Sequence, residues 1–342
     1  MRLVALFMNP AIIGLVALFL SVLWMLRDER DRTRPVLVIA LVLNLLYGWL
    51  LNVVLGGADS LLPWKYDYYL LRMDQSLGLS AASIAIPFQG AWRVPLYVIY
   101  QLMVPMMIFW YVKHRQQSGN GSVVLAYAAE MVAGPILYAV LPACGPVYAF
   151  GATWLHHTEP SVQAVRFSGM PNAFPSLHIA TALLFVLFAT GRLWRVISVV
   201  FLVGTALATI TTGEHYAIDL IPGLAFGCFA ASIGYRRVLA AFPYLGIVLL
   251  WSLAIRFGSE LLITRPVLVR SFAAITLTLV IWTVWRRWRI ATTCPTSIHP
   301  SELVEPDRRP SKLLPYLRPG LVSPTISLST ENTLFQSDEA RP

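Results

Sequence analysis

The sequence predicts an all-α fold: a polytopic transmembrane helix bundle of about nine spans, followed by a disordered C-terminal tail. Three observations predict this class. Apolar residues make up 57% of the 342 residues and charged residues only 13%, whereas a soluble domain carries about 25% charged residues. The mean hydropathy is +0.65. Long apolar runs recur along the chain, and short clusters of arginine and lysine separate most of them.

Nine apolar runs are candidates for crossing a membrane, because a hydrocarbon core of about 30 Å requires about 20 helical residues. The predicted spans are 3–26, 36–55, 94–112, 122–141, 176–190, 195–212, 216–234, 239–256 and 268–285. The first run is too long for the apolar part of a signal peptide, so we expect a retained helix. Several runs are short, which leaves open that one of them is re-entrant or tilted.

Polar segments divide the chain into regions. Residues 65–78 are amphipathic and too polar to span, so they are predicted to lie at a membrane interface. The last 53 residues hold eight prolines and many Ser and Thr, which predicts a disordered cytoplasmic tail. The predicted regions are N-terminal transmembrane helices over 1–60, an interfacial segment and loop over 61–92, a central transmembrane core over 93–238, C-terminal transmembrane helices over 239–289, and the tail over 290–342.

The distribution of basic residues predicts the orientation. With the N-terminus outside, thirteen Lys and Arg fall in inside loops and eight outside, as the positive-inside rule requires. We therefore expect an external N-terminus and a cytoplasmic C-terminus. Because the net charge of +9 is spread over many short loops rather than one soluble face, no nucleic-acid partner is expected.

The first segment with candidate chemistry is 166–183, RFSGMPNAFPSLHIATAL. Pro175 suits the first turn of a helix, and Ser176 and His178 then open an apolar run. A helix N-terminus presents free N–H groups and the positive end of the helix dipole, which favours phosphate. A hydroxyl and an imidazole there could bind and protonate a phosphoryl oxygen. The alternative is a capped helix start with an interfacial histidine.

The second segment is 211–223, TTGEHYAIDLIPG. His215 and Asp219 are four residues apart, so they share one face of a helix. A carboxylate that fixes the imidazole tautomer prepares the histidine as a nucleophile or base. The alternative is a structural His–Asp pair. Because the orientation puts His178 and His215 on one membrane face, together they predict a phosphoryl-transfer site in which His215 attacks phosphorus and His178 exchanges the protons.

These residues resemble two signature motifs of a known family. The segments 173–178 (AFPSLH) and 215–219 (HYAID) are similar to the second and third motifs of the phosphatidic acid phosphatase type 2 superfamily. The first segment is closer to the branch that contains the inositolphosphorylceramide synthases, since the superfamily's lipid phosphatases have Gly where Leu177 stands. The stretch 138–146 (YAVLPACGP) also resembles that branch. The resemblance covers 120–235 well and 60–120 loosely.

The resemblance implies a phosphatase-like core over 93–238 and a role for each matching residue. His215 would be the nucleophile that forms a phosphohistidine, Asp219 its partner, His178 the general acid and base, and Ser176 a phosphate contact. It implies a metal-independent lipid phosphatase or phosphotransferase of lipid or sphingolipid metabolism, with no cofactor. The expected partners are the bilayer, a phospholipid or other lipid-phosphate substrate, and a lipid or polyol hydroxyl as acceptor.

The sequence departs from the family pattern in two places. The superfamily has Ser-Arg ahead of the histidine of the third motif, where this chain has Ala208 and Thr209. The first motif is a lysine, six residues and Arg-Pro; Lys65 and Arg72 have that spacing, but Met73 replaces the proline. The pair also lies two spans further upstream than the family order. Lys65 and Arg72 are therefore candidate phosphate-binding cations rather than an intact motif.

Other features are compatible with other interpretations. Arg166 is a further candidate phosphate contact, or a loop arginine facing headgroups. Adjacent His156 and His157 point in different directions, so no metal site is predicted. Glu130 falls in mid-span and is left outside the site.

The competing function is that of a transporter or flippase with a vestigial site. Such a protein would spread intramembrane charges along a path, whereas most of the intramembrane charges here cluster on one face. The active site is expected on the non-cytoplasmic face.

Overall fold

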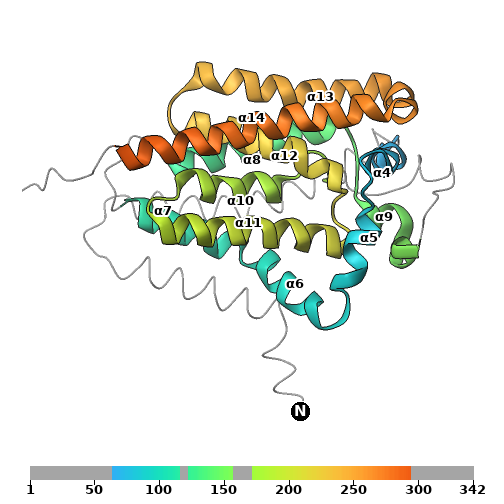
Figure 1. The fold of residues 1–342 in the computed structure, drawn as a ribbon, viewed down its shortest axis with the longest axis horizontal. Coiled ribbons are helices and arrows are strands. Elements are labelled where there is room, and N and C mark those ends of the chain that lie inside the picture. The colour runs from blue at the N-terminus through green and yellow to red at the C-terminus, as the bar shows by residue number, and fades with distance from the viewer. Residues whose placement is uncertain (1–63, 116–121, 157–171, 294–342) are drawn as a thin grey trace, which may run out of the picture. The chain divides into compact units, whose positions relative to one another are not determined.

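The computed structural model describes residues 64–115, 122–156 and 172–293, and over these ranges the chain forms helices and no β-strand (Figure 1). The predicted all-α class is thus confirmed for this part of the chain. The predicted spans 3–26 and 36–55 lie outside the described residues, as does the tail beyond Thr293. The described helix α14 runs to Thr293, three residues past the predicted start of the tail.

The described helices follow one another in a simple order. They are α4 (Asp67–Ser76), α5 (Ala81–Ala85), η1 (Ile86–Phe88), η2 (Gly90–Trp92), α6 (Arg93–Gln101), α7 (Met103–Arg115), α8 (Val123–Val140), α9 (Pro146–Phe150), η3 (Gly151–His156), α10 (Leu177–Phe188), α11 (Arg192–Thr212), α12 (Ala217–Gly234), α13 (Val238–Thr264) and α14 (Pro266–Thr293).

Five of the described helices are long and apolar enough to cross a membrane, namely α8, α11, α12, α13 and α14. The predicted span 94–112 is instead a pair, in which α6 with the preceding turn and α7 are bent by 43°; counted as one span, the pair makes six. The predicted span 176–190 is a helix of only 12 residues, α10. Several apolar helices therefore fit a multi-pass membrane protein.

The short helix α10 is buried along its length because other helices surround it. It packs against α8, α11 and α12, and every residue of α10 except His178 is buried. Glycines on α12 allow the backbones to approach closely: a Cβ at Gly223 would lie 2.7 Å from the Ser176 carbonyl oxygen, and one at Gly227 would lie 2.8 Å from that of Ala180. Small residues allow this kind of contact between membrane helices.

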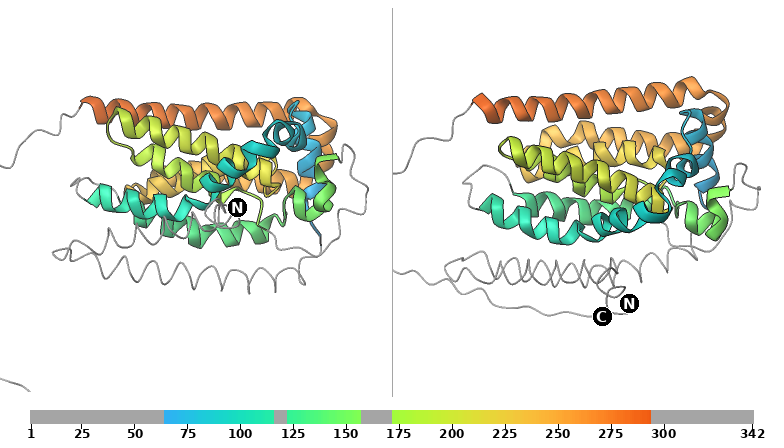
Figure 2. Two further views of the ribbon diagram at one scale, coloured as in Figure 1. Left: turned by 90° about the horizontal axis from the view of Figure 1, so that it is seen from below. Right: turned by 60° about the horizontal axis from the view of Figure 1, so that its bottom comes forward.

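Helices α13 and α14 lie side by side over α12 (Figures 1 and 2). Both extend beyond the predicted spans 239–256 and 268–285, since α13 has 27 residues and α14 has 28. Arg256 was expected to mark the end of the span 239–256. It instead lies inside α13 and donates a hydrogen bond to the Val140 carbonyl at the end of α8. A carbonyl partner thus lets the helix continue past the charge.

Helix α4 lies at one end of the bundle, near α5 and α9 (Figures 1 and 2). The sequence predicts this segment to be interfacial, but its polar residues do not all face outward. Asp67 and Asp74 are both fully buried, and the helix packs against α12, α13 and α14. The two aspartates make α4 part of the site described below.

Candidate active site

Two histidines meet at the end of the bundle where α10 begins. His178 is in the first turn of α10, and His215 is in the loop between α11 and α12. His178 Nδ1 lies 3.4 Å from His215 Nε2, and the two rings are tilted by 71° with their centroids 5.6 Å apart. Helix α11 packs along α10 and returns the chain to the end from which α10 started, so the two histidine segments become neighbours.

The position of His215 is set by the turn that ends α11. Gly213 takes the left-handed conformation that commonly ends a helix, with φ of 78°. The N–H groups of Glu214 and His215 both donate to the Thr209 carbonyl. On the other side, Gly145 has φ of +93°, and a Cβ there would lie 2.2 Å from the Glu214 carbonyl oxygen. Only glycine fits at position 145, so this contact fixes the loop that carries the histidine.

Asp219 links both histidine segments. Its Oδ2 lies 3.6 Å from His215 Nδ1 and accepts a hydrogen bond of 2.9 Å from the Tyr216 N–H. Its backbone carbonyl accepts from the Ser176 N–H at 3.2 Å. The carboxylate is fully buried, and its Oδ1 has no hydrogen-bond partner among the described residues. His215 Nδ1 is also buried without a hydrogen-bond partner among the described residues, so Asp219 lies next to one nitrogen of the His215 ring while the other faces His178.

Ser176 forms the N-cap of α10. Its hydroxyl is fully buried and accepts from the Ile179 N–H at 3.4 Å. The segment before it is held by backbone hydrogen bonds, in which Asn172 and Ala173 both donate to the Ala143 carbonyl. The capped start of α10, which was the alternative interpretation, is thus present, and its serine lies within one turn of the histidine. Pro175 was expected in the first turn but precedes the N-cap, because the helix begins only at Leu177.

Two buried carboxylates on α4 complete this end of the bundle, and sequence reasoning missed both. Asp74 accepts hydrogen bonds from the Ala217 N–H at 3.0 Å and the Ile218 N–H at 2.7 Å, at the start of α12. Asp67 accepts from the N–H of Gly145 at 2.8 Å and from the Tyr216 hydroxyl at 2.9 Å. The signal available in the sequence was their spacing of seven residues, which places both on one helix face.

Burial controls the protonation of these groups. It raises the pKa of Asp67 from 3.8 to about 6, although the hydrogen bonds donated to the carboxylate oppose this. It also raises the pKa of Asp74, with the charge of Asp219 adding to the effect. It lowers the pKa of His215 from 6.5 to about 4, while the charge of Glu214 works in the opposite direction. His215 is therefore a neutral imidazole at physiological pH, which is the state a nucleophile requires.

Tyrosines lie next to the two histidine segments. The Tyr100 ring stacks on His178, with centroids 4.5 Å apart, and Tyr97 stacks on Tyr100 at 6.0 Å. On the other segment, the Tyr148 hydroxyl donates to Glu214 at 2.9 Å. The sequence of the predicted span 94–112 does not predict that its tyrosines contact His178. This contact depends on the bend between α6 and α7 and on the packing of α6 against α11.

The three predicted phosphate-binding cations have different surroundings. Lys65 is buried, and the next residue, Tyr66, donates its N–H to the Pro142 carbonyl. Arg72 instead donates to Gln75 at 3.1 Å and lies over the Tyr68 ring. It lines a cavity of about 350 Å³ that includes residues at the α13–α14 turn but neither histidine. Arg166 lies outside the described residues.

Glu130 and the adjacent histidines His156 and His157 are further groups considered in the sequence. Glu130 on α8 is buried, and one of its oxygens accepts a 2.6 Å hydrogen bond from Thr181 on α10, while the other has no partner in the described part of the chain. His156 ends η3, and His157 lies outside the described ranges. Within those ranges, no group of three or more His, Cys, Asp or Glu residues is arranged to hold a metal ion.

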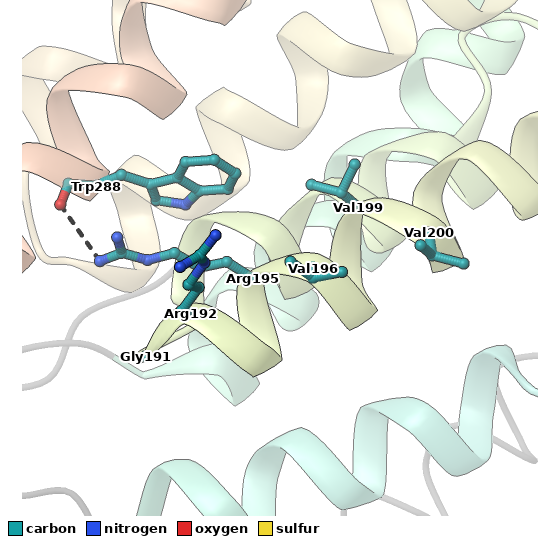
Figure 3. A pocket seen from close by; sticks show the side chains of 7 residues that line it. All are labelled: Gly191, Arg192, Arg195, Val196, Val199, Val200 and Trp288. Carbon is teal, nitrogen blue, oxygen red and sulfur yellow. Dashed lines mark hydrogen bonds between the residues drawn. The ribbon is translucent and has the colours of Figure 1, made fainter.

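A cavity of about 640 Å³ lies at the opposite end of α11 (Figure 3). Arg192 and Arg195 line it together with Trp288 and valines of α11. Arg195 donates to the Trp288 carbonyl at 3.3 Å and its guanidinium lies over the Trp288 ring. The cavity lies along the first part of α11, as far as Val200, so the rest of the helix, about 20 Å long, separates it from the histidine end. Its described lining contains no acid and no histidine.

Comparison with known proteins finds one family. The family model of the PAP2 superfamily matches residues 68–233. The match includes His178, His215 and Asp219 and leaves out Lys65, and it does not separate the branches of the superfamily. A search of curated proteins and a search of solved structures each gave no match. The family match indicates a phosphatase-type activity in a membrane protein.

Proposed function

We propose that this chain is a metal-independent lipid phosphatase or phosphotransferase that works through a phosphohistidine at His215. The proposal rests on three side chains that lie in a row at one end of the bundle. His178 Nδ1 lies 3.4 Å from His215 Nε2, and His215 Nδ1 lies 3.6 Å from Asp219 Oδ2. The superfamily match supports a phosphatase-type reaction. We propose that the substrate is a lipid phosphate, that a phosphohistidine forms, and that the reaction requires no metal.

In the first step, His215 attacks phosphorus. We assign the His215 proton to Nδ1, because that nitrogen faces Asp219, and this leaves the lone pair of Nε2 free. The lone pair forms the P–N bond, the P–O ester bond breaks, and its electron pair goes to the leaving oxygen. The negative charge of the bound phosphate favours the protonated form of His178, which gives its proton to that oxygen.

In the second step, an oxygen of water or of a lipid or polyol hydroxyl attacks the phosphohistidine. His178 takes the proton from this oxygen, the P–N bond breaks, and its electron pair returns to Nε2. Water completes a hydrolase and a hydroxyl completes a transferase. The segment 173–178 favours the transferase, since it resembles the inositolphosphorylceramide synthase branch. The 3.4 Å contact leaves no room for phosphorus between the nitrogens, so we expect the rings to part when substrate binds.

The location of the site supports an action at the non-cytoplasmic surface. The histidine end of α11 is opposite the end that carries Arg192 and Arg195, and basic clusters mark the cytoplasmic side. With the predicted spans 3–26 and 36–55 added, we propose an external N-terminus and a cytoplasmic C-terminus. A vestigial site in a transporter or flippase is disfavoured, because the buried carboxylates Asp67, Asp74 and Asp219 gather at one end.

The proposal is tested by trapping the intermediate. Purified full-length protein is mixed with a panel of lipid phosphates in the presence of EDTA, quenched within milliseconds to seconds, and digested under alkaline conditions for mass spectrometry. We expect phosphate, or the phosphorylated headgroup, on His215. The label should disappear in His215→Ala and persist in His114→Ala, a control histidine on α7. Turnover without any label on His215, or turnover abolished by EDTA and restored by a metal, would contradict the proposal.

A further inference from the structure

Glu214 places a carboxylate beside the nucleophile. It directly precedes His215 in the chain and is half-buried. Its oxygens accept hydrogen bonds of 2.9 and 3.0 Å from the Tyr148 hydroxyl. In the described part of the chain, no lysine or arginine forms an ion pair with it. A negative charge at this place repels a phosphate anion, so a substrate with a compensating positive charge would be favoured.

Three tyrosines share the neighbourhood of that carboxylate. Tyr148 is 50% exposed and Tyr97 is 37% exposed, so their rings are open to a ligand. Tyr97 lies parallel to Tyr100 within 5°, and Tyr100 stacks on His178. The His178 ring on which Tyr100 stacks lies 3.4 Å from His215, the residue next to Glu214. These contacts connect the tyrosine pair on α6 with Glu214 and its partner Tyr148 through the two histidines. Aromatic faces and a carboxylate are the groups that bind ammonium and quaternary ammonium ions in proteins.

We propose that Glu214, Tyr97, Tyr100 and Tyr148 bind the positively charged headgroup of a zwitterionic phosphodiester lipid while its phosphate contacts His178 and His215. This inference rests on the proposed function, because it takes the histidines as the phosphate site. In such a lipid a short linker joins the ammonium to the phosphate, and the two charges cancel. A phosphate monoester brings up to two negative charges and nothing to pair with Glu214.

A neutral polyol headgroup is the competing ligand. Its hydroxyls could hydrogen-bond to Glu214 and to the tyrosines, but they would leave the carboxylate charge uncompensated beside a phosphate. The absence of an ion pair for Glu214 among the described residues therefore favours the cation. The two ligands differ in one measurable property, the dependence of binding on charge.

The test compares two short-chain phosphodiester lipids that differ in one atom. One carries choline, and the other carries 3,3-dimethylbutanol, in which carbon replaces the charged nitrogen. For the wild-type full-length protein in detergent micelles, kcat/KM should favour the choline lipid by roughly tenfold, the size of a desolvated cation–π contact. In Glu214→Gln this ratio should fall to near one. Tyr148→Phe, which keeps the ring and loses the hydroxyl, should give an intermediate ratio.

A matched control exists elsewhere in the chain. Glu260 on α13 also accepts a hydrogen bond from a tyrosine, Tyr69, at 3.1 Å, so Glu260→Gln removes a similar carboxylate away from the histidines and should keep the wild-type ratio. A wild-type ratio near one, or a ratio unchanged in Glu214→Gln, would overturn the inference. So would a polyol-headed lipid that surpasses both choline and its isostere.

The inference can fail separately from the proposed function. If the wild-type protein turns over none of these lipids, binding is measured instead. The choline lipid and its isostere are each titrated at equilibrium against the His215→Ala variant. Preferential binding of the choline lipid that disappears when Glu214→Gln is added supports the headgroup site even without turnover. Equal binding of both lipids overturns it. Loss of the label on His215, by contrast, bears only on the mechanism of the proposed function.

Discussion

The two ends of the α10–α11 hairpin hold charged groups in different settings. At the histidine end, Asp67, Asp74 and Asp219 are fully buried and bonded to backbone N–H groups, and cations such as Lys65 and Arg72 lie at the same end. At the other end the charged groups are basic and lie on aromatic rings: Lys113 is 4.1 Å from the centre of Trp194, and Arg287 is 3.4 Å from that of Tyr235.

This difference indicates that the histidine end carries the proposed chemistry and that the basic end anchors the protein at the membrane surface. Burying a carboxylate is unfavourable unless donors surround it, and three such groups at one end fix the position of one loop histidine. Cations over tryptophan and tyrosine rings at the other end are only partly buried, and this arrangement is typical of residues at a membrane surface. The following changes should therefore affect turnover at one end and only stability at the other.

The largest effect should come from the histidines. His215→Ala removes the nucleophile and His178→Ala removes the proton donor, so each should lower kcat on the order of 10³-fold or more. Release of phosphate or of transferred headgroup from a lipid substrate measures the loss, and circular dichroism checks that the helices remain. Unchanged turnover in either variant would remove the mechanism proposed for this end.

The next effect should come from Asp219→Asn. The amide keeps the size of the side chain but no longer fixes the proton on His215 Nδ1, so kcat should fall on the order of 10² to 10⁴-fold. The Tyr216 N–H can still donate to the amide oxygen, so the melting temperature should change little. A large fall in melting temperature with preserved turnover would mean that Asp219 is only a structural cap.

A loss of stability should follow from Asp74→Ala. The change leaves the N–H groups of Ala217 and Ile218 without their acceptor at a buried helix start, which costs about 1–3 kcal/mol per group. Thermal unfolding in detergent measures it. Because the same helix start carries Asp219, kcat should fall up to about a hundredfold. Asp74→Asn retains one acceptor oxygen and should lose less in both measurements; an equal loss would contradict the hydrogen-bonding role.

The pH dependence sharpens the comparison. Burial lowers the pKa of His215 to about 4, so the nucleophile stays neutral from the ordinary histidine value of 6.5 down to that pH and protonates below it. The acid limb of kcat/KM should therefore centre near pH 4. Since the charge of Glu214 raises this pKa, Glu214→Gln should move the limb to lower pH. An acid limb near 6.5 in the wild-type protein would show an exposed, ordinary histidine.

The smallest effect should come from the basic end. Arg195→Ala removes the hydrogen bond to the Trp288 carbonyl and the contact over its ring, which together should contribute about 1 kcal/mol. Thermal unfolding should show this small loss, while kcat for the lipid substrate stays at the wild-type value. A fall in kcat comparable to that of Asp74→Ala would show that the two ends are coupled.

The spacing of residues along the chain is enough to predict part of the site. His215 and Asp219 can be paired because four residues make about one helical turn, although His215 itself lies just ahead of α12. Asp67, Asp74 and Tyr100 cannot be placed in this way, since their partners lie on other segments. Arg72 donates to Gln75 and lies over the Tyr68 ring, and its role in phosphate binding stays a prediction.

The sequence by itself determined that the described chain is helical and apolar enough for a membrane, since composition and apolar run length act locally and leave helices as the way to satisfy the backbone in lipid. It also determined which residues are candidates for the chemistry, because His, Asp and Ser are conspicuous in apolar runs. Only the tertiary structure decided that two histidines meet and that α4 supplies two carboxylates to α12 and its neighbours. Those contacts join residues far apart in sequence, whose distances depend on how the helices pack and not on their order.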